Sequence, residues 1–197
     1  YYFNWLCGDH ITEQHVHNLD VSNWVKQAYP VRAHGSGGRQ VRIGKEFGEI
    51  YDHHTIEYEY ADGSRMFSQC RQIPGTKDSV TEGFHGTNGS APWPGKILTR
   101  SGYSIFDYDA KNDPNPYQVE HDELFAAIAK GEYKFADAEN AAKSTMTAIM
   151  GRMASYSGQL IEWDAALQSG INLMPEKLSW DALPKVLPGA DGMYACA

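Results

Sequence analysis

The run IYDHHTIEYEYADGSRMFSQCR, residues 50–71, indicates a β-hairpin and with it the class of fold. In its first half Ile56, Tyr58 and Tyr60 alternate with two glutamates, which is typical of a strand with one buried face. Asp62-Gly63 is a hairpin turn signal, and residues 65–71 return from it. The region from about residue 31 to residue 73 therefore predicts an antiparallel hairpin.

Upstream of the hairpin the sequence predicts a strand and then a helix. The opening residues 1–6, YYFNWL, are typical of a buried strand, and the chain starts without an initiator methionine, so we expect a piece of a longer protein. From about His10 to Ala28, apolar residues recur at helical spacing. Between this helix and the hairpin, residues 35–38, GSGG, open no helix and predict a turn.

Downstream of the hairpin the sequence predicts short strands at 80–85, 96–99 and 103–108, which we expect to extend the same sheet. Asn115 followed by Pro116 predicts a helix start. That helix should end near Gly131 and bury a stripe of three side chains: Leu124, Phe125 and Ile128. A longer helix should follow Asp137 and run to about residue 158, with a short strand at 160–163, a brief helix and an irregular tail after it.

This order predicts one α+β domain over residues 1–197: an open, mainly antiparallel mixed sheet with helices packed on one face. The other face of such a sheet usually needs a cover. We therefore expect a homo-oligomer formed through the open sheet face.

Composition narrows the class of protein. The net charge is −8, with 17 Lys+Arg against 25 Asp+Glu. No segment contains enough basic residues to bind along a phosphate backbone, so we expect no nucleic-acid partner. No apolar run could span a bilayer, so we expect no membrane partner and a soluble protein, cytoplasmic by default, with export of the parent left open. The three cysteines, Cys7, Cys70 and Cys196, are widely spaced and should be ordinary thiols.

The predicted first helix carries a polar stripe that could do proton chemistry. His10, Glu13, His17, Asp20 and Trp24 are spaced 3, 4, 3 and 4 residues apart and so share one helix face. A carboxylate one turn before an imidazole can accept its ring N–H, as a general acid/base requires. On spacing alone, an exposed i,i+4 ion pair between Glu13 and His17 is the favoured explanation.

A metal site is the alternative for the histidines. His10, His15 and His17 lie on the predicted helix, and His53 and His54 lie on the hairpin. However, His15 and His17 are about 160° apart around a helix, and His53 and His54 point to opposite faces of a strand. We therefore predict no metal ligand in this chain.

Residues 8–20, GDHITEQHVHNLD, followed by Trp24, resemble the glucose-fructose oxidoreductase, inositol dehydrogenase and rhizopine-catabolism (Gfo/Idh/MocA) family of oxidoreductases. In that family a glycine-containing turn leads into a helix with an acid, a histidine four residues later and an aspartate three further on. Glu13, His17 and Asp20 match these positions. Residues 37–40, GGRQ, match a subgroup, and residues 117–131 and 138–163 resemble the family's later helices and return strand.

The resemblance implies a dihydrodipicolinate-reductase-like C-terminal domain. An N-terminal Rossmann domain, absent from this sequence, would bind NAD or NADP and supply a lysine, so this chain should hold no cofactor-binding residue and be inactive alone. His17 would be the catalytic acid/base and Glu13 its partner. The sequence departs from the family in having glutamate at position 13 and Gly8-Asp9 where many relatives have consecutive glycines.

The resemblance also implies a sugar, polyol or related hydroxy compound as substrate. Asn4, His10 and Gln14 are candidate substrate-binding residues because many hydroxyls need several hydrogen bonds. Two other functions stay open: part of an NAD-dependent glycoside hydrolase of the same family, and a non-catalytic binding or assembly module.

Overall fold

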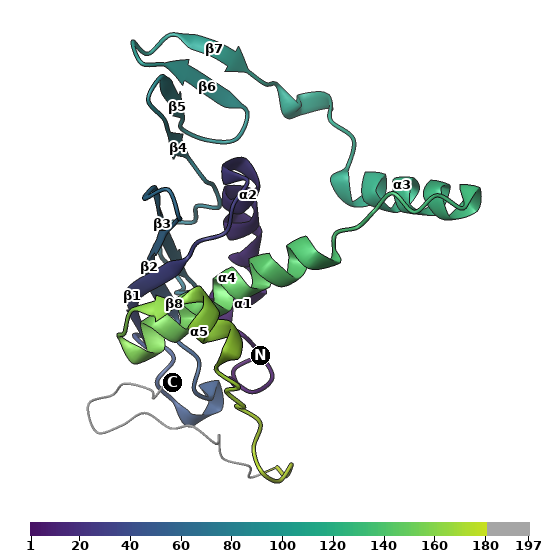
Figure 1. Cartoon of the computed structure of the whole chain (residues 1–197). Helices are drawn as coiled ribbons and strands as arrows, with labels where there is room; N and C mark the ends of the chain where they lie inside the picture. The colour runs from purple at the N-terminus through teal and green to yellow at the C-terminus, as the bar shows by residue number, and fades with distance from the viewer. Residues whose placement is uncertain (181–197) are drawn as a thin grey trace. The chain divides into compact units, whose positions relative to one another are not determined.

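The computed structural model describes residues 1–180 of the chain, the side chain of Lys45 excepted (Figure 1). We predicted a single domain over residues 1–197, and this stays a prediction. The chain has two compact units. The first consists of Tyr1–Asp78 with the described residues from Ala141 onward, and the second of Ser79–Asn140. Each unit is described by itself below.

The first unit is built on a sheet of order β3-β2-β1-β8, in which every neighbouring pair is antiparallel. Its strands are β1 (Arg32–Gly38), β2 (His53–Glu59), β3 (Arg65–Arg71) and β8 (Ile161–Glu162). The predicted hairpin is confirmed as β2 and β3, which pair from His53–Arg71 to Glu59–Arg65. Its turn contains Gly63 at φ +82°, a conformation that favours glycine.

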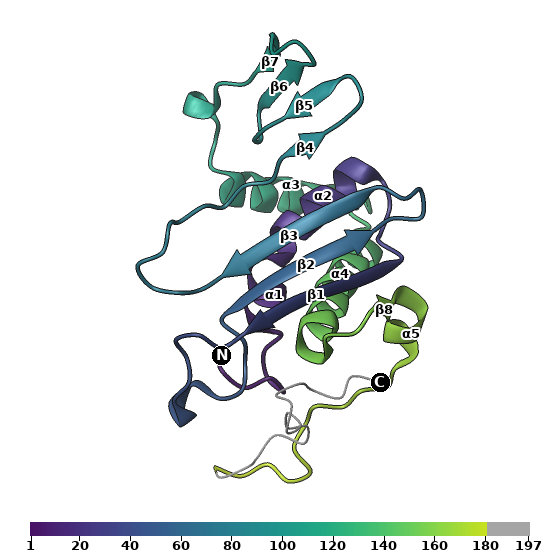
Figure 2. The same ribbon diagram turned by 90° about the vertical axis from the view of Figure 1, so that its left-hand side faces the viewer.

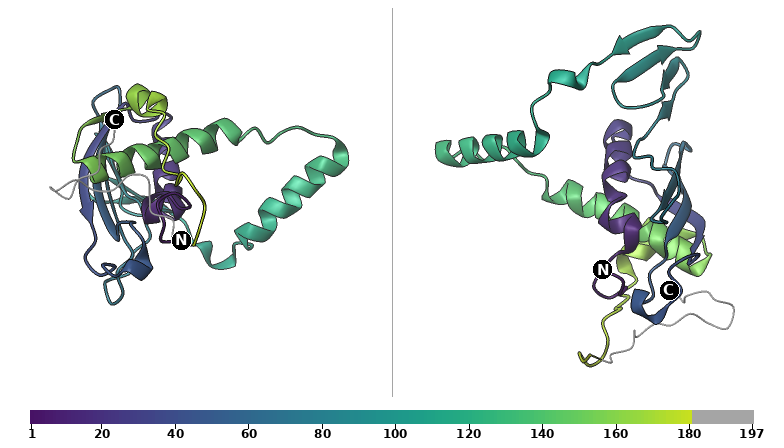
Figure 3. Two further views of the ribbon diagram at one scale, coloured as in Figure 1. Left: turned by 90° about the horizontal axis from the view of Figure 1, so that it is seen from below. Right: turned by 180° about the vertical axis from the view of Figure 1, so that it is seen from behind.

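Helices cover one face of this sheet, as the sequence predicted. They are α1 (Asp9–Glu13), α2 (Val16–Lys26), α4 (Ala138–Ser157) and α5 (Trp163–Gln168). Figure 2 shows α1, α2 and α4 behind the strands, and Figure 3 shows the sheet to one side of α1 and α4. The core between the two layers contains Ile11, Leu19, Ile56, Tyr58 and Met150, which come from four different elements. The α+β architecture is therefore confirmed.

The outer face of the sheet is more polar than we expected. Along one row Arg32 pairs with Glu59, which also pairs with Arg65, and the large apolar side chain in the next row is Phe67, 74% exposed. Cross-strand pairs of opposite charge stabilise a solvent-facing sheet surface modestly. This face is therefore mainly a ladder of charges.

Two predictions near the N-terminus were wrong. Residues 1–6 form no strand: residues 4–6 form a turn, in which the backbone N–H groups of Leu6 and Cys7 both donate to the Phe3 carbonyl at 3.0 Å. The predicted continuous helix is broken between α1 and α2 at residues 14–15. His15 lies at this break on the inward side, and its Nε2 is 2.8 Å from Ser68 Oγ on β3. A buried ring nitrogen needs such a partner.

The predicted turn at 35–38 was also wrong, because these residues form the second half of β1. The glycines fit this strand for a packing reason. A Cβ at Gly35 would lie 2.4 Å from the Thr55 carbonyl oxygen, and one at Gly37 would lie 2.6 Å from the His53 carbonyl oxygen. The strand is glycine-rich because β2 approaches it closely.

The second unit has its own antiparallel sheet of order β4-β5-β6-β7, so the prediction that these strands extend the first sheet was wrong. Its elements are β4 (Phe84–His85), β5 (Gly89–Ala91), β6 (Lys96–Thr99), β7 (Ser104–Asp107) and α3 (Pro116–Lys130). The start of α3 is confirmed, since Asn115 Oδ1 accepts from the Tyr117 N–H and Pro116 occupies the first turn. Gly131 ends α3 at φ +68°.

The predicted buried stripe of α3 is not buried within the described residues. Leu124 is 43% exposed, Phe125 63% and Ile128 62%. The prediction of a helix was correct, but the prediction that these three side chains are buried was wrong. The part of the predicted irregular tail from residue 181 to residue 197, which includes Cys196, lies outside the described residues.

Candidate active site

Glu13 and His17 lie on opposite sides of the break between α1 and α2. Glu13 is the last residue of α1 and His17 the second of α2, and both side chains are exposed. In residues 1–180 the structure gives no hydrogen bond or ion pair between them. Glu13 instead lies against the Cys7 thiol, whose pKa rises to about 11 through burial first and this carboxylate second.

The last two residues of the polar stripe, Asp20 and Trp24, differ in their surroundings. Ser144 of α4 donates to Asp20, so Asp20 joins α2 to α4. Trp24 is 68% exposed near the end of α2. Glu13 and His17 are therefore both exposed, one on each side of the break, whereas Asp20 bonds to α4.

The three candidate substrate-binding residues differ in accessibility. Gln14 is exposed at the break, whereas His10 is half-buried and Asn4 is only 5% exposed. Burial lowers the pKa of His10, with smaller contributions from His54 and Arg42. Neither Asn4 Oδ1 nor His10 Nδ1 has a hydrogen-bond partner within the described residues.

Sequence reasoning missed a buried polar cluster directly before this site. Its centre is Asp9, fully buried at the start of α1, which accepts hydrogen bonds from the Tyr156 hydroxyl of α4 and from the Tyr51 N–H at 3.2 Å. Arg152 Nε is 3.5 Å from Asp9 Oδ1, and His54 Nε2 is 3.4 Å from Oδ2. The cluster joins the first residue of α1 to both the sheet layer and α4.

Aromatic stacking holds the same cluster together. The Tyr51 and Tyr156 rings stack with centroids 3.9 Å apart, and the Arg152 guanidinium lies 4.8 Å from the Tyr156 centroid. Burial, followed by the charge of Asp9, raises the pKa of Tyr156 well above its ordinary value. Tyr156 therefore acts here as a neutral hydrogen-bond donor. The sequence signal for the cluster was Asp9 itself, which departs from the consecutive glycines of the pattern that residues 8–20 resemble.

The hairpin histidines are both occupied by structural contacts. His54 is 1% exposed and its Nδ1 lies 2.8 Å from Ser155 Oγ, so it belongs to the Asp9 cluster. His53 Nδ1 lies 2.7 Å from Asp52 Oδ1, while the other Asp52 oxygen accepts three backbone N–H groups of residues 40–42. In the described residues, no group of three His, Cys, Asp or Glu side chains could hold a metal ion.

His15 leads to a prediction about the dependence of stability on pH. Burial lowers its pKa from 6.5 to about 4, helped by His10 and His54. The unfolded chain therefore binds a proton near pH 6.5 that the folded chain resists until about pH 4, so the folding stability falls as the pH drops through this window. We expect a loss on the order of 1–2 kcal/mol between pH 7 and pH 5.

Denaturant unfolding at several pH values measures this effect. His15→Gln should flatten the profile over that window, because the amide can still bond to Ser68 but does not titrate. His85→Gln, at an exposed position in the second unit, is the matched control and should leave the profile unchanged. If His15→Gln and wild type show parallel profiles, another group carries the dependence.

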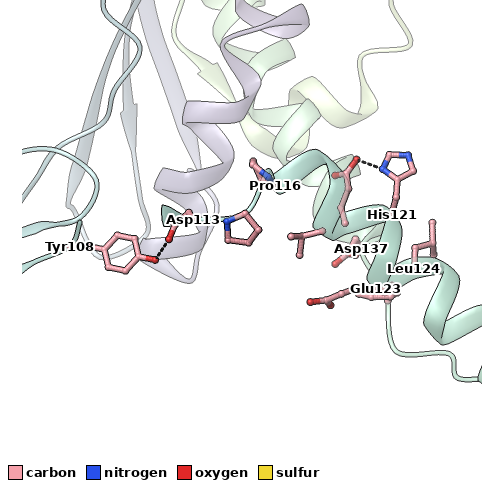
Figure 4. Close-up of a pocket in the computed structure, with 11 residues that line it drawn as sticks. Tyr108, Asp113, Pro116, His121, Glu123, Leu124 and Asp137 are labelled. Atoms are coloured by element: carbon pink, nitrogen blue, oxygen red, sulfur yellow. Dashed lines mark hydrogen bonds and ion pairs between the residues drawn. The ribbon is translucent and has the colours of Figure 1, made fainter. Parts of the chain in front are cut away.

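The second unit contains an open hollow of about 830 Å³ bounded by Tyr108, residues 113–114, the first half of α3 and the segment before α4 (Figure 4). Pro116, Leu124 and Phe135 supply apolar lining, and the Tyr108 hydroxyl donates to Asp113 at 2.6 Å on its rim. These lining side chains are largely solvent-exposed. None of the sequence-predicted site residues lines this hollow.

Solved structures similar to this chain share one class of fold, the α+β domain of dehydrogenase-type oxidoreductases. An aldose-aldose oxidoreductase from Caulobacter crescentus matches 75% of the present chain, with TM-score 0.59 and 14% identity. A scyllo-inositol dehydrogenase from Lactobacillus casei, determined with NAD(H) and scyllo-inositol, matches with TM-score 0.57 and 14% identity over 76%. A putative myo-inositol dehydrogenase from Sinorhizobium meliloti matches with TM-score 0.56 and 17% identity over 79%.

These neighbours are Gfo/Idh/MocA-type oxidoreductases, so the fold implied by the resemblance of residues 8–20 is confirmed. The chain spans 45%, 46% and 52% of the lengths of these three proteins. No family model matches the sequence, and no curated protein does. No helix in the described part of the chain is long and apolar enough to cross a membrane.

Proposed function

We propose that this chain is the substrate-binding domain of an NAD(P)-dependent oxidoreductase that acts on a sugar, polyol or related hydroxy compound. His17 is its general acid/base and Glu13 is the partner of His17. One observation carries this proposal. On a fold shared with sugar and inositol dehydrogenases, the imidazole at the matching position is exposed, and so is the carboxylate four residues before it.

The neighbouring histidines support the choice of His17 by their contacts. The rings of His15, His53 and His54 are bonded to Ser68, Asp52 and Ser155, respectively. The structure gives the His17 ring no hydrogen bond or ion pair to another described residue. A ring that exchanges protons with a substrate hydroxyl must keep a nitrogen accessible, and His17 meets this requirement.

In the proposed mechanism His17 accepts the proton of a substrate hydroxyl during oxidation and returns it during reduction. Glu13 accepts the second ring N–H once substrate is bound. Catalytic hydrogen bonds often close only in the substrate complex. The separation of Glu13 from His17 across the break between α1 and α2 is therefore compatible with this role. Gln14, exposed between them, is the candidate with the freest access to substrate hydroxyls. His10 and Asn4 act from more buried positions.

The described residues do not fit a dinucleotide site. Every strand pairing in both sheets is antiparallel, so the described chain has no parallel strand-helix-strand unit to hold a pyrophosphate. We therefore propose that NAD or NADP binds to an N-terminal Rossmann domain of the parent protein. The hydride acceptor belongs to that domain, and this chain alone is inactive.

The quaternary structure that we propose is a homo-oligomer formed through the outer face of the first sheet. The support for this is Phe67, which stands exposed among the charge ladder of that face.

Steady-state assays of the full-length parent test the function. With a panel of polyols and aldoses, we expect NAD(P)H to accumulate in proportion to the substrate oxidised. Release of sugar from a glycoside without net NAD(P)H would instead assign the parent to the NAD-dependent glycoside hydrolases. Absence of both activities would favour a binding or assembly module.

A further inference from the structure

We propose that Asp9 is a positioning residue of the active site, which fixes the start of α1 and thereby the place of Glu13 beside His17. This inference rests on the proposed function. It assigns a role to the buried cluster of Asp9, His54, Arg152 and Tyr156, which that function leaves unused.

The backbone at Asp9 is the first observation. Its φ is +64°, in the left-handed region that favours glycine and is uncommon for other residues. A glycine would fit here without strain. An aspartate in this conformation persists only where its side chain makes compensating contacts, and such strained residues cluster at functional sites.

The contacts of the carboxylate are the second observation. Asp9 is 0% exposed, yet Tyr156 and the Tyr51 N–H donate to it and the Arg152 and His54 side chains approach it within 3.5 and 3.4 Å. A buried carboxylate is tolerated when it is paired and hydrogen-bonded in this way. One donor comes from α4 and the other from Tyr51, just before β2, and His54 lies on β2, so the cluster joins α1 to α4 and to the region of β2.

The place of Asp9 in α1 is the third observation. This helix has only five residues, with Asp9 at its first position and Glu13 at its last. The His15–Ser68 contact follows two residues after Glu13 and holds the break. The segment that carries Glu13 is thus held at both ends, by Asp9 before it and by His15 after it.

A short helix held at both ends has little freedom to shift. Displacement of a catalytic group by about 1 Å can reduce a rate about 100-fold. Loss of the Asp9 contacts should therefore reduce kcat, because Glu13 no longer meets the His17 ring correctly. KM should change by a smaller factor than kcat, because Asp9 is buried and does not touch substrate, although His10 and Gln14 lie on the same segment as Glu13.

The test uses three variants of the full-length parent. Asp9→Gly keeps the left-handed backbone without strain and removes the carboxylate, and we expect it to lower kcat by tenfold or more while KM changes by a clearly smaller factor. Tyr156→Phe removes one donor to Asp9 and should lower kcat several-fold. Asp9→Asn keeps an oxygen acceptor for Tyr156 and Tyr51, so its kcat should recover to within about threefold of wild type.

Tyr60→Phe is the matched control. The Tyr60 hydroxyl is also buried and donates to a helix side chain, Asn23 Oδ1 at 3.0 Å, but near the far end of α2. Its kcat should stay within twofold of wild type at a loss of Tm similar to that of Tyr156→Phe. Equal changes of kcat in Tyr60→Phe and Tyr156→Phe, or normal kcat in Asp9→Gly, would overturn the proposal.

A His17 variant separates failure of this inference from failure of the proposed function. If His17→Ala abolishes turnover while Asp9→Gly does not change it, only the positioning role is wrong. If His17→Ala has normal turnover, the proposed site itself is wrong. If Asp9→Gly does not fold, the comparison of Tyr156→Phe with Tyr60→Phe still decides the matter.

Discussion

His17→Ala in the full-length protein is expected to lower kcat by about 10²- to 10⁴-fold, the range that a positioned general acid/base contributes. The substrate hydroxyl must lose its proton as the hydride leaves the carbon, and alanine offers no acceptor. Because the His17 side chain is exposed and the structure gives its ring no bond to a described residue, its removal should leave Tm nearly unchanged. Steady-state kinetics at saturating NAD(P)⁺ measure the effect.

Two further variants serve as the control and the comparison for His17→Ala. His34→Ala removes another exposed histidine of the same unit, on β1, and should leave kcat unchanged. Glu13→Gln should lower kcat less than His17→Ala, because it weakens the orientation of the ring but keeps the base. Unchanged turnover in His17→Ala would remove His17 from any catalytic role and would favour the non-catalytic binding module.

The parts of the fold that the sequence predicted correctly are those with local signals. Asp62-Gly63 marks the hairpin turn, and Asn115 with Pro116 marks the start of α3. The long helix α4 was predicted from its apolar spacing, and Met150 and Met153 of that pattern are buried. In each case the residues that determine the element lie within a few positions of it, so one sequence contains the necessary information.

The parts that the sequence did not predict depend on contacts between distant residues. The break between α1 and α2 coincides with the contact of His15 with Ser68, 53 positions away. The Asp9 cluster depends on Tyr156, 147 positions away. Helical spacing placed Glu13 and His17 on one face, but spacing assumes a continuous helix and does not reveal such contacts. The division of the strands into two sheets was missed for the same reason.

The resemblance to a family contributed most where spacing was ambiguous. Spacing alone could not distinguish a surface ion pair from a catalytic pair at Glu13 and His17. The family pattern selected the catalytic interpretation and marked Asp9 as a departure from consecutive glycines. In the structure, position 9 has the backbone conformation that glycine favours, but its carboxylate accepts a hydrogen bond that glycine could not accept.

Gly151→Ala is expected to destabilise the fold by about 2–3 kcal/mol, although alanine is the better helix former by about 1 kcal/mol. Gly151 lies in α4, where a Cβ would be 1.9 Å from the Tyr58 hydroxyl oxygen and 3.2 Å from Ile11 Cδ1. Tyr58 is 0% exposed on β2 and cannot move away. Denaturant unfolding of the chain measures the change, and Thr145→Ala, at an exposed position of α4, is the control that should stay within about 0.5 kcal/mol of wild type.

A second substitution tests the proposed cause of this loss. The Tyr58 hydroxyl has no hydrogen-bond partner within the described residues, so Tyr58→Phe alone should change stability little. Combined with Gly151→Ala it should restore part of the loss, because the closest clash is removed while the Cζ atom, 2.8 Å from the new Cβ, still crowds it. Strictly additive effects of the two substitutions would contradict this explanation, since residues in contact should couple. Partial rescue would show that Gly151 permits the close packing of α4 on β2, the same packing that brings Tyr156 to Asp9.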